Sequence, residues 1–303
     1  MAQVTLRASV ALEHGRLPIA IGRTLMSAPP ATERPVWLDL DCLQPRQQLL
    51  LSLTRATVEI LEAASVPCWI TGGTLLGALR HKGFVPHDDD VDLECFEADL
   101  DSIVKAFEGR QRLSFRLGGL WKETRVGHVR LDGADVELDI FLREAELLEL
   151  PDFPSRAEVF PLQRFPFNGL SLEGPGFPEG FLARLYGADW AGSVKVWSHD
   201  FNDVHGLAHD PNRVLLPMAE YEALVASLGY VAPPPPAEAA LGDALAAEAA
   251  LEALFEPGGA VAAYKTAAQA TWLDKLRRRN REQAEAQLQL SAGGSRDAAD
   301  ADG

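Results

Sequence analysis

The chain has 303 residues, of which 47% are hydrophobic and 24% charged, the composition of an ordinary globular protein. Its formal net charge of −16 repels phosphate groups, so we expect neither a nucleic-acid partner nor docking on an anionic membrane. No apolar run reaches the ~20 residues that span a bilayer. The first residues also lack the basic and long apolar segments typical of a signal peptide. We therefore expect a cytoplasmic protein without a membrane span.

The first part of the sequence alternates between helix-like and strand-like segments. The expected elements are, in chain order, an arm over 1–44, a helix over 45–64, a buried strand over 66–71, a short helix over 74–80, a strand over 91–96 and a helix over 97–109. Pro45 suits a helix start, and Gly109 is a typical C-terminal stop.

Beyond residue 110 the sequence predicts a strand meander followed by helices. The expected elements are strands over 113–117, 122–131 and 134–142, an irregular segment over 151–180, helices over 181–187 and 218–229, a helix between the prolines at 233–236 and Phe255, and a helix over 260–290. Asp132-Gly133 predicts a tight hairpin turn. Residues 291–303 are expected to be disordered.

The three cysteines, Cys42, Cys68 and Cys95, are odd in number and form no CxxC pattern. Cys68 and Cys95 lie in apolar runs. We expect isolated, buried and reduced thiols rather than a disulfide or a zinc site.

An acidic run leads directly into one of the expected strands. Because side chains alternate along a strand, Asp90 and Asp92 are expected to share a face, with Cα atoms ~6.5–7 Å apart, while Val91 points into the core. That spacing lets two carboxylates converge on one Mg²⁺ or bracket a pair of ions. The competing interpretation is a solvated acidic loop. Asp88 and Asp89 precede the strand and are assigned a supporting role.

A third carboxylate occurs in a similar context downstream. In the segment 136–141 acidic and apolar residues alternate, so Glu137 and Asp139 share one face of a strand. If this strand lies beside 91–96, one of the two acids completes a metal site. Asp139, in the more apolar surroundings, is the better candidate, with Glu137 as a neighbour or surface residue.

Backbone N–H donors and cationic side chains precede the aspartates in the sequence. Gly72-Gly73, between a strand and a helix, lets N–H groups approach a phosphate. Arg80 and Lys82 are candidate phosphate ligands, and His81 is as well explained by a structural role as by a catalytic one. Alternatively, these three residues neutralise the aspartates or face solvent.

The segment GGTLLGALRHKGFVPHDDDVDL, followed by LDIF at 138–141 and YGADW at 186–190, closely resembles the signature of the LicD family of phosphocholine transferases and fukutin-related proteins. The match covers about residues 65–200. His87 stands where the family usually has Trp, and all the acidic positions are retained.

This resemblance implies an α+β fold with a polymerase-β-like nucleotidyltransferase core, a small mixed sheet with helices on one side, here over residues 45–230. A Pro/Ala-rich linker and C-terminal helices over 231–290 would form a helical extension. By analogy Gly72, Gly73 and Thr74 form the phosphate-binding turn, and Asp90, Asp92 and Asp139 hold Mg²⁺, with Mn²⁺ as the alternative.

The activity implied by the resemblance is transfer of a phosphocholine or polyol-phosphate group from a CDP-linked donor to a hydroxyl of a glycan or other small acceptor. The alternative is a non-catalytic nucleotide-binding module with a degenerate version of the same fold. An adenylylating toxin or antitoxin-type enzyme shares the core motif but usually lacks the long block.

Overall fold

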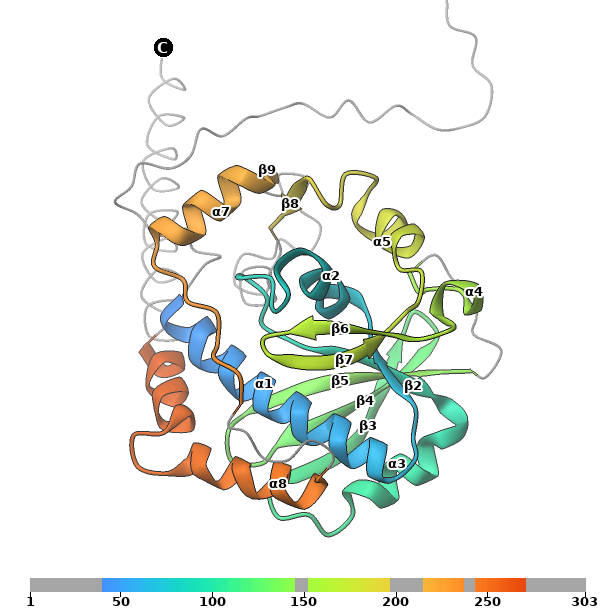
Figure 1. Ribbon diagram of the computed structural model, residues 1–303. Helices are drawn as coiled ribbons and strands as arrows, with labels where there is room; N and C mark the ends of the chain where they lie inside the picture. Colours follow the sequence, from blue (N-terminus) through green and yellow to red (C-terminus); the bar gives the residue numbers. More distant parts are fainter. Residues whose placement is uncertain (1–39, 145–151, 197–214, 237–242, 271–303) are drawn as a thin grey trace, which may run out of the picture. The chain divides into compact units, whose positions relative to one another are not determined.

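A five-stranded mixed sheet forms the centre of the computed structural model, which describes residues 40–144, 152–196, 215–236 and 243–270 (Figure 1). Its strands lie in the order β1 (Cys68–Ile70), β2 (Asp92–Phe96), β5 (Val136–Arg143), β4 (Thr124–Leu131) and β3 (Leu113–Trp121). β2 and β5 are parallel and the other neighbours are antiparallel. The predicted mixed α+β architecture is confirmed.

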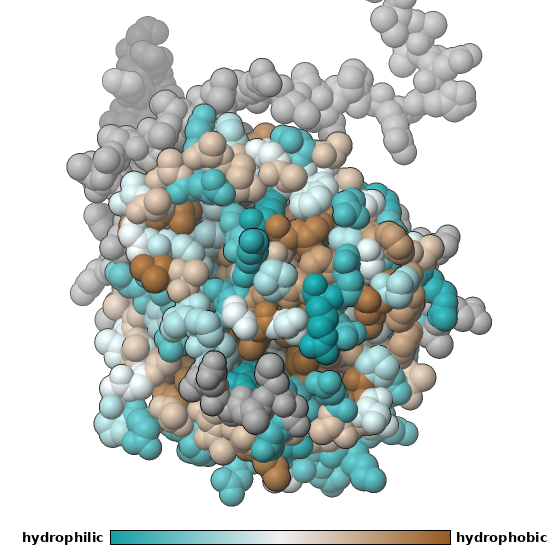
Figure 2. Space-filling view, in the orientation of Figure 1, coloured by the Kyte–Doolittle hydropathy of each residue, from teal (hydrophilic) through white to brown (hydrophobic). Residues whose placement is uncertain are grey.

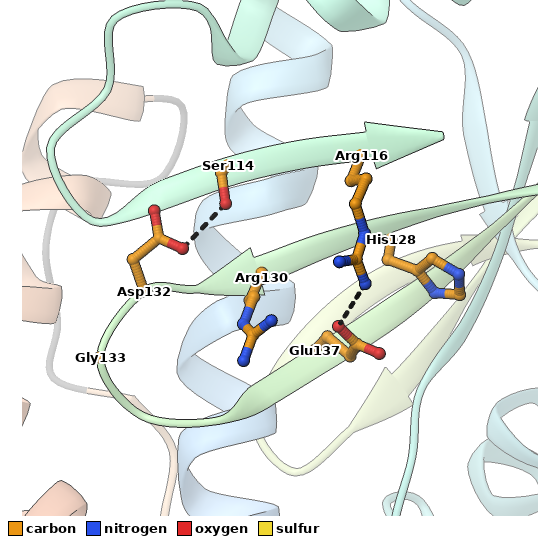
Figure 3. Close-up of a pocket in the computed structure, with 7 residues that line it drawn as sticks. All are labelled: Ser114, Arg116, His128, Arg130, Asp132, Gly133 and Glu137. Carbon is orange, nitrogen blue, oxygen red and sulfur yellow. Dashed lines mark hydrogen bonds and ion pairs between the residues drawn. The ribbon is translucent and has the colours of Figure 1, made fainter. Parts of the chain in front are cut away.

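The two faces of the sheet differ in polarity. Leu138 and Ile140 of β5 are fully buried on the face covered by α1 (Leu40–Ala63) and α3 (Leu100–Phe107). A 3-10 turn, η1 (Glu97–Asp99), precedes α3. Figure 3 shows α1 behind the strands and polar side chains on the opposite face. This alternation assigns one face to the core and the other to the candidate site.

Helix α1 differs from its predicted form. It begins at Leu40, inside the segment expected to be an arm, and Pro45 lies within the helix rather than at its start. Leu40 and Leu43 are buried in the core, so apolar burial favours the helix before the proline as well as after it. Residues 1–39, the rest of the expected arm, lie outside the described residues.

The segment expected to be irregular, 151–180, contains regular structure. It holds the helix α4 (Arg156–Val159) and the antiparallel hairpin of β6 (Gln163–Phe167) and β7 (Leu170–Gly174). Asn168 and Gly169 link the two strands with φ of 46° and 84°, values typical of a type I′ turn. A second small ribbon pairs β8 (Ser193–Lys195) with β9 (Leu215–Pro217) and was also not predicted.

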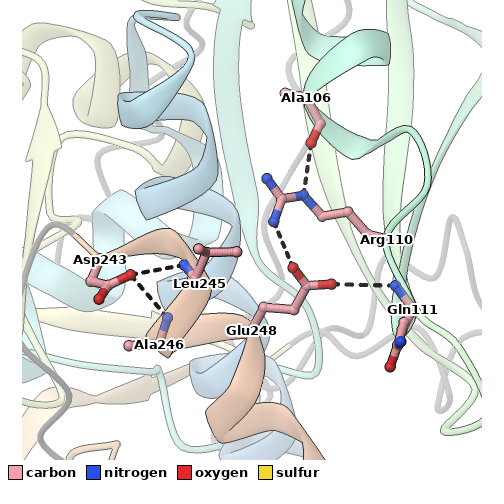
Figure 4. Close-up of polar contacts among 7 residues, drawn as sticks. All are labelled: Ala106, Arg110, Gln111, Asp243, Leu245, Ala246 and Glu248. Atoms are coloured by element: carbon pink, nitrogen blue, oxygen red, sulfur yellow. Dashed lines mark hydrogen bonds and ion pairs between the residues drawn. The ribbon is translucent and has the colours of Figure 1, made fainter.

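The later helices pack on the same core. They are α5 (Glu179–Tyr186), α7 (Met218–Ser227), α8 (Ala244–Glu252), the 3-10 turn η2 (Ala253–Phe255) and a helix described over 260–270. Asp243 caps α8, and Glu248 bonds Arg110 at 2.6 Å (Figure 4). In the segment expected to be a linker, the carbonyl of Pro233 accepts a bond from Asn168. Residues 271–303, with the rest of the last helix and the tail, lie outside the described part.

Two further predictions concern the cysteines and membrane-spanning helices. Cys68 and Cys95 are free, as predicted, but Cys68 is only partly buried, and the two are not isolated, because they face each other across β1 and β2. Of the helices described, none is long and apolar enough to cross a bilayer. Hydrophilic and hydrophobic residues are interspersed over the face shown in Figure 2.

Candidate functional site

Asp92 and Asp139 are direct neighbours on the polar face of the sheet. They are paired in the parallel register of β2 and β5, which confirms that the two strands lie side by side. Neighbouring strands are ~4.8 Å apart. In the next strands His128 pairs with Asp139, and Arg116 pairs with His128. A row of polar side chains therefore crosses the sheet and ends at the two carboxylates.

The aspartates before β2 gather beside this pair. Ligand oxygens of Asp88, Asp89 and Asp90 lie within 4.8 Å of one another. Burial, and then the charges of Asp90, Asp92 and Asp89, raise the pKa of Asp88 well above its ordinary value. Asp90 lies before β2, which begins at Asp92, and not on the strand as predicted. Asp88, assigned only a supporting role from the sequence, lies among the predicted ligands.

The glycine turn holds Asp92 in place. Gly72 has a φ of 51°, and a Cβ there would overlap the Asp92 carboxylate. The Gly73 N–H donates to Oδ2 of Asp92 at 3.1 Å, and the hydroxyl of Thr74 accepts from the Asp92 N–H at 2.8 Å. Both glycines belong to the first turn of α2 (Gly72–His81), so the acids lie at the N-terminus of a helix, where negative charge is favoured.

Side chains of helix α1 donate hydrogen bonds to the backbone of the aspartate segment, a role that no sequence pattern indicates. The side chain of Gln47 is fully buried, and its amide donates to the carbonyl of Asp88 at 2.8 Å. Its own oxygen accepts from the hydroxyl of Tyr230 at 2.9 Å. Arg46 donates to the carbonyl of Asp89 at 2.5 Å. These contacts fix the backbone from which the carboxylates project.

His128 orients Asp139 and was not predicted as a site residue. Its Nδ1 lies 2.7 Å from Oδ1 of Asp139. A Cβ at Gly118 would overlap the ring, so the glycine leaves the space that His128 occupies. Partners of this kind fix the orientation of a metal-binding carboxylate.

The predicted phosphate-binding cations lie at the other end of α2. Arg80 donates to the carbonyl of Ser193 at 2.6 Å, and Lys82 forms the left-handed C-cap of the helix. The 10-residue helix is ~15 Å long, so Lys82 and Gly73 do not share one phosphate. Burial, followed by the charge of Arg80, lowers the pKa of His81 to about 4. The helix C-terminus favours these cations irrespective of any ligand.

His87, which stands in place of the family's tryptophan, is buried against Tyr221. Its Nδ1 lies 2.7 Å from the Tyr221 hydroxyl, and the rings meet edge to face at 5.5 Å. Burial lowers the pKa of His87 to about 3. Tyr186 of the YGADW segment also lies near the acids, since burial and the charges of Asp92 and Asp88 raise its pKa. The aromatic side chains of Tyr186 and Tyr221 thus lie near the acidic cluster.

The donor set fits a hard divalent cation. Carboxylate oxygens are the ligands that Mg²⁺ and Mn²⁺ take, and the spacing around Asp88 to Asp90 accommodates two oxygens on one ion. Burial raises the pKa of Asp88 most, and the charges of the neighbouring carboxylates raise it further; a cation would relieve that repulsion. The carboxylates that lie within reach of one ion are those of Asp88, Asp89 and Asp90, and Asp92 and Asp139 are paired across β2 and β5 beside them.

Comparison with known proteins finds sequence similarity to one described family and to several transferases. The sequence profile described as LicD/FKTN/FKRP, nucleotidyltransferase domain, matches residues 65–176. An uncharacterized protein of Rickettsia typhi is 29% identical over 161 residues, 50% of each chain. Ribitol 5-phosphate transferase FKRP of Mus musculus is 28% identical over 50% of this chain and 33% of its own length.

Lipopolysaccharide cholinephosphotransferase LicD of Haemophilus influenzae is 39% identical over 51 residues, 17% of this chain and 19% of its own. The chain thus matches about half the length of the Rickettsia relative and less of the two transferases. The profile and the two named transferases point to one family. For residues 65–176, these comparisons support the LicD family.

Proposed function

We propose that the protein is a metal-dependent transferase that moves a phospho-substituent, of the phosphocholine or polyol-phosphate type, from a CDP-linked donor to a hydroxyl of a glycan or other small acceptor. The observation that carries the proposal is the side-by-side placement of Asp92 and Asp139 at the end of a polar row, with Asp88 and Asp90 beside them. The related transferases support the class of group transferred.

The proposed core is of the nucleotidyltransferase type. A glycine turn that opens a helix, followed by paired acids on two parallel strands of a small mixed sheet, supports it. The helices α1 and α3 on a single face agree with the same expectation.

Each acid has a distinct place in the proposed reaction. Asp92 and Asp90 would hold Mg²⁺ against the donor phosphates, and Asp139 would hold it on the acceptor side. Bound Mg²⁺ neutralises phosphate charge and lowers the pKa of the acceptor hydroxyl. His128 keeps the carboxylate of Asp139 in one orientation, which preserves the alignment of the acceptor.

The proposed transfer is a single in-line displacement. The acceptor oxygen forms a bond to the phosphorus that bears the choline or polyol. The bond from that phosphorus to the bridging oxygen breaks, and CMP leaves with that oxygen. The hydroxyl proton passes to Asp139 or to solvent. The field of the α2 N-terminus beside Gly73 favours the negative charge of the donor.

Release of CMP tests the proposal. The purified protein is incubated with Mg²⁺ and with CDP-choline or CDP-ribitol, and CMP is measured with and without candidate glycans. We expect CMP from the wild type and a loss of ~10²-fold or more in Asp92→Asn and Asp139→Asn, because several kcal/mol of transition-state stabilisation is removed.

Asp101→Asn, on the exposed side of α3, is the matched control and is expected to keep full turnover. Unchanged turnover in Asp92→Asn and Asp139→Asn would contradict the assignment. Nucleotide binding without CMP release from any donor would favour the non-catalytic alternative.

A further inference from the structure

A polar groove lies on the same face of the sheet as the paired acids. It encloses about 320 Å³ (Figure 3). Its lining comes from β3, β4, β5 and the turn between the last two, and consists of Ser114, Arg116, His128, Arg130, Asp132, Gly133 and Glu137. None of the predicted site residues lines it.

The register of the strands connects this groove to the site. Arg130 pairs with Glu137 two residues along from the pairing of His128 with Asp139. Glu137 and Asp139 are two residues apart on one strand and therefore share its polar face. His128 belongs to both regions, since it lines the groove and lies 2.7 Å from Asp139. The groove thus ends at the carboxylate assigned to the acceptor side.

The charges of the groove are balanced. Arg116 lies 3.8 Å from Glu137, and Arg130 lies 2.8 Å from Asp135. Ser114 donates to Asp132 at 2.8 Å. A phosphate would meet arginines that already have carboxylate neighbours. An uncharged polyhydroxyl group, by contrast, offers both the acceptors that arginines need and the donors that carboxylates need.

The groove is also accessible. The side chains of Arg116 and Glu137 are 66% and 40% exposed, and their long 3.8 Å contact is one that solvent screens. A ligand hydroxyl can therefore enter between them without breaking a buried ion pair.

We propose that this groove binds the uncharged, hydroxyl-rich part of the acceptor, a sugar or polyol, and directs one of its hydroxyls to Asp139. The inference rests on the proposed function, because that function places the acceptor hydroxyl beside Asp139. Glu137 and Arg116 act as binding residues, and His128 positions Asp139 between the groove and the acids.

Side-chain NMR on protein labelled with ¹⁵N-arginine tests binding without a nucleotide. The Nε signals of Arg116 and Arg130 are assigned by their loss in Arg116→Lys and Arg130→Lys. The probes are ribitol, methyl β-galactopyranoside and methyl β-glucopyranoside, with inorganic phosphate as the charged comparison. We expect at least one neutral probe to shift both signals saturably, and Glu137→Gln to weaken that binding about 5- to 10-fold, the loss of one hydrogen bond.

Glu173→Gln is the matched control, because Glu173 pairs with Arg164 on the β6–β7 hairpin at similar exposure and is expected to leave binding unchanged. No shift with any neutral probe, or a shift with phosphate alone, overturns the inference. An equal loss in Glu137→Gln and Glu173→Gln also overturns it. Binding of a neutral probe without CMP release would support the sugar-binding groove and refute the proposed transfer. Failure of the inference and failure of the proposed function are therefore distinguishable.

Discussion

Replacing Gly72 with alanine tests how Asp92 is held. Gly72 has a φ of 51°, in the left-handed region, which costs an L-residue ~1–2 kcal/mol. A Cβ at this position would also overlap Oδ2 of Asp92, the atom that accepts the Gly73 N–H. The substitution therefore acts on the backbone and on the carboxylate together.

The backbone strain and the displaced carboxylate together set the loss of unfolding free energy in Gly72→Ala. When the carboxylate turns away, the 3.1 Å bond from Gly73 is lost, and hydrogen bonds to charged groups contribute ~1.5–3 kcal/mol. Release of Asp92 from the repulsion of Asp88 offsets part of this loss. We expect the free energy of unfolding to fall by ~2–4 kcal/mol in Gly72→Ala.

Urea unfolding of two variants separates these effects. Gly109 has a φ of 75°, and within the described residues a Cβ there meets no atom within 4 Å, so Gly109→Ala should lose only ~1–2 kcal/mol. Gly72→Ala should also lose CMP release, whereas Gly109→Ala should keep it. Equal losses of stability with unchanged turnover in both variants would refute the account of Asp92.

Three further predictions follow from the contacts around the site and the fold. Gln47→Leu should lower the free energy of unfolding by ~2–3 kcal/mol in urea titrations, because buried carbonyl partners lose their donor. Arg184 holds the pKa of Glu158 at about 2, so Glu158→Gln should cost ~1 kcal/mol at pH 7, allowing for solvent screening. That difference should be present above pH 4.5 and vanish as the pH falls through about 2. His128→Leu should weaken Mn²⁺ binding ~10-fold, measured by electron paramagnetic resonance, while His128→Asn retains more of it through its amide donor.

Each of these results has a control. Gln48→Leu, at the neighbouring, partly exposed position of α1, should change stability less than Gln47→Leu, and an equal loss would contradict the buried contacts. A Glu158→Gln difference that stays constant from pH 7 to pH 2 would exclude the ion pair as its source. Equal Mn²⁺ affinity in His128→Leu and the wild type would show that the histidine does not orient Asp139.

Local alternation predicts part of this site from the sequence. A metal site completed by Asp139 requires its strand to lie beside the strand that carries Asp92, and the register shows that it does. The tight turn that the sequence predicts at Asp132-Gly133 would pair His128 with Glu137. The turn spans 132–135 and pairs His128 with Asp139 instead. A turn longer by two residues therefore moved the histidine to the acid that it contacts.

Other features depend on contacts between distant residues. Nothing near Gln47 in the sequence indicates that it bonds the backbone of Asp88, 41 residues away. Asp88 joins the cluster because β2 begins only at Asp92, so the residues before it follow a loop rather than a strand. The β6–β7 hairpin had a local signal, Asn168-Gly169 between apolar residues, that the abundance of Pro, Phe and Gly nearby obscured.

Binding of Mn²⁺ in place of Mg²⁺ tests the central claim, that acids from β2, β5 and the segment before β2 form one metal centre. Affinity is measured by electron paramagnetic resonance for the wild type, Asp92→Asn, Asp139→Asn and the control Asp101→Asn. We predict binding that is ~10- to 100-fold weaker in Asp92→Asn and Asp139→Asn and unchanged in Asp101→Asn, because the first two variants each lose one proposed carboxylate ligand. Equal Mn²⁺ affinity in all four proteins would contradict the account.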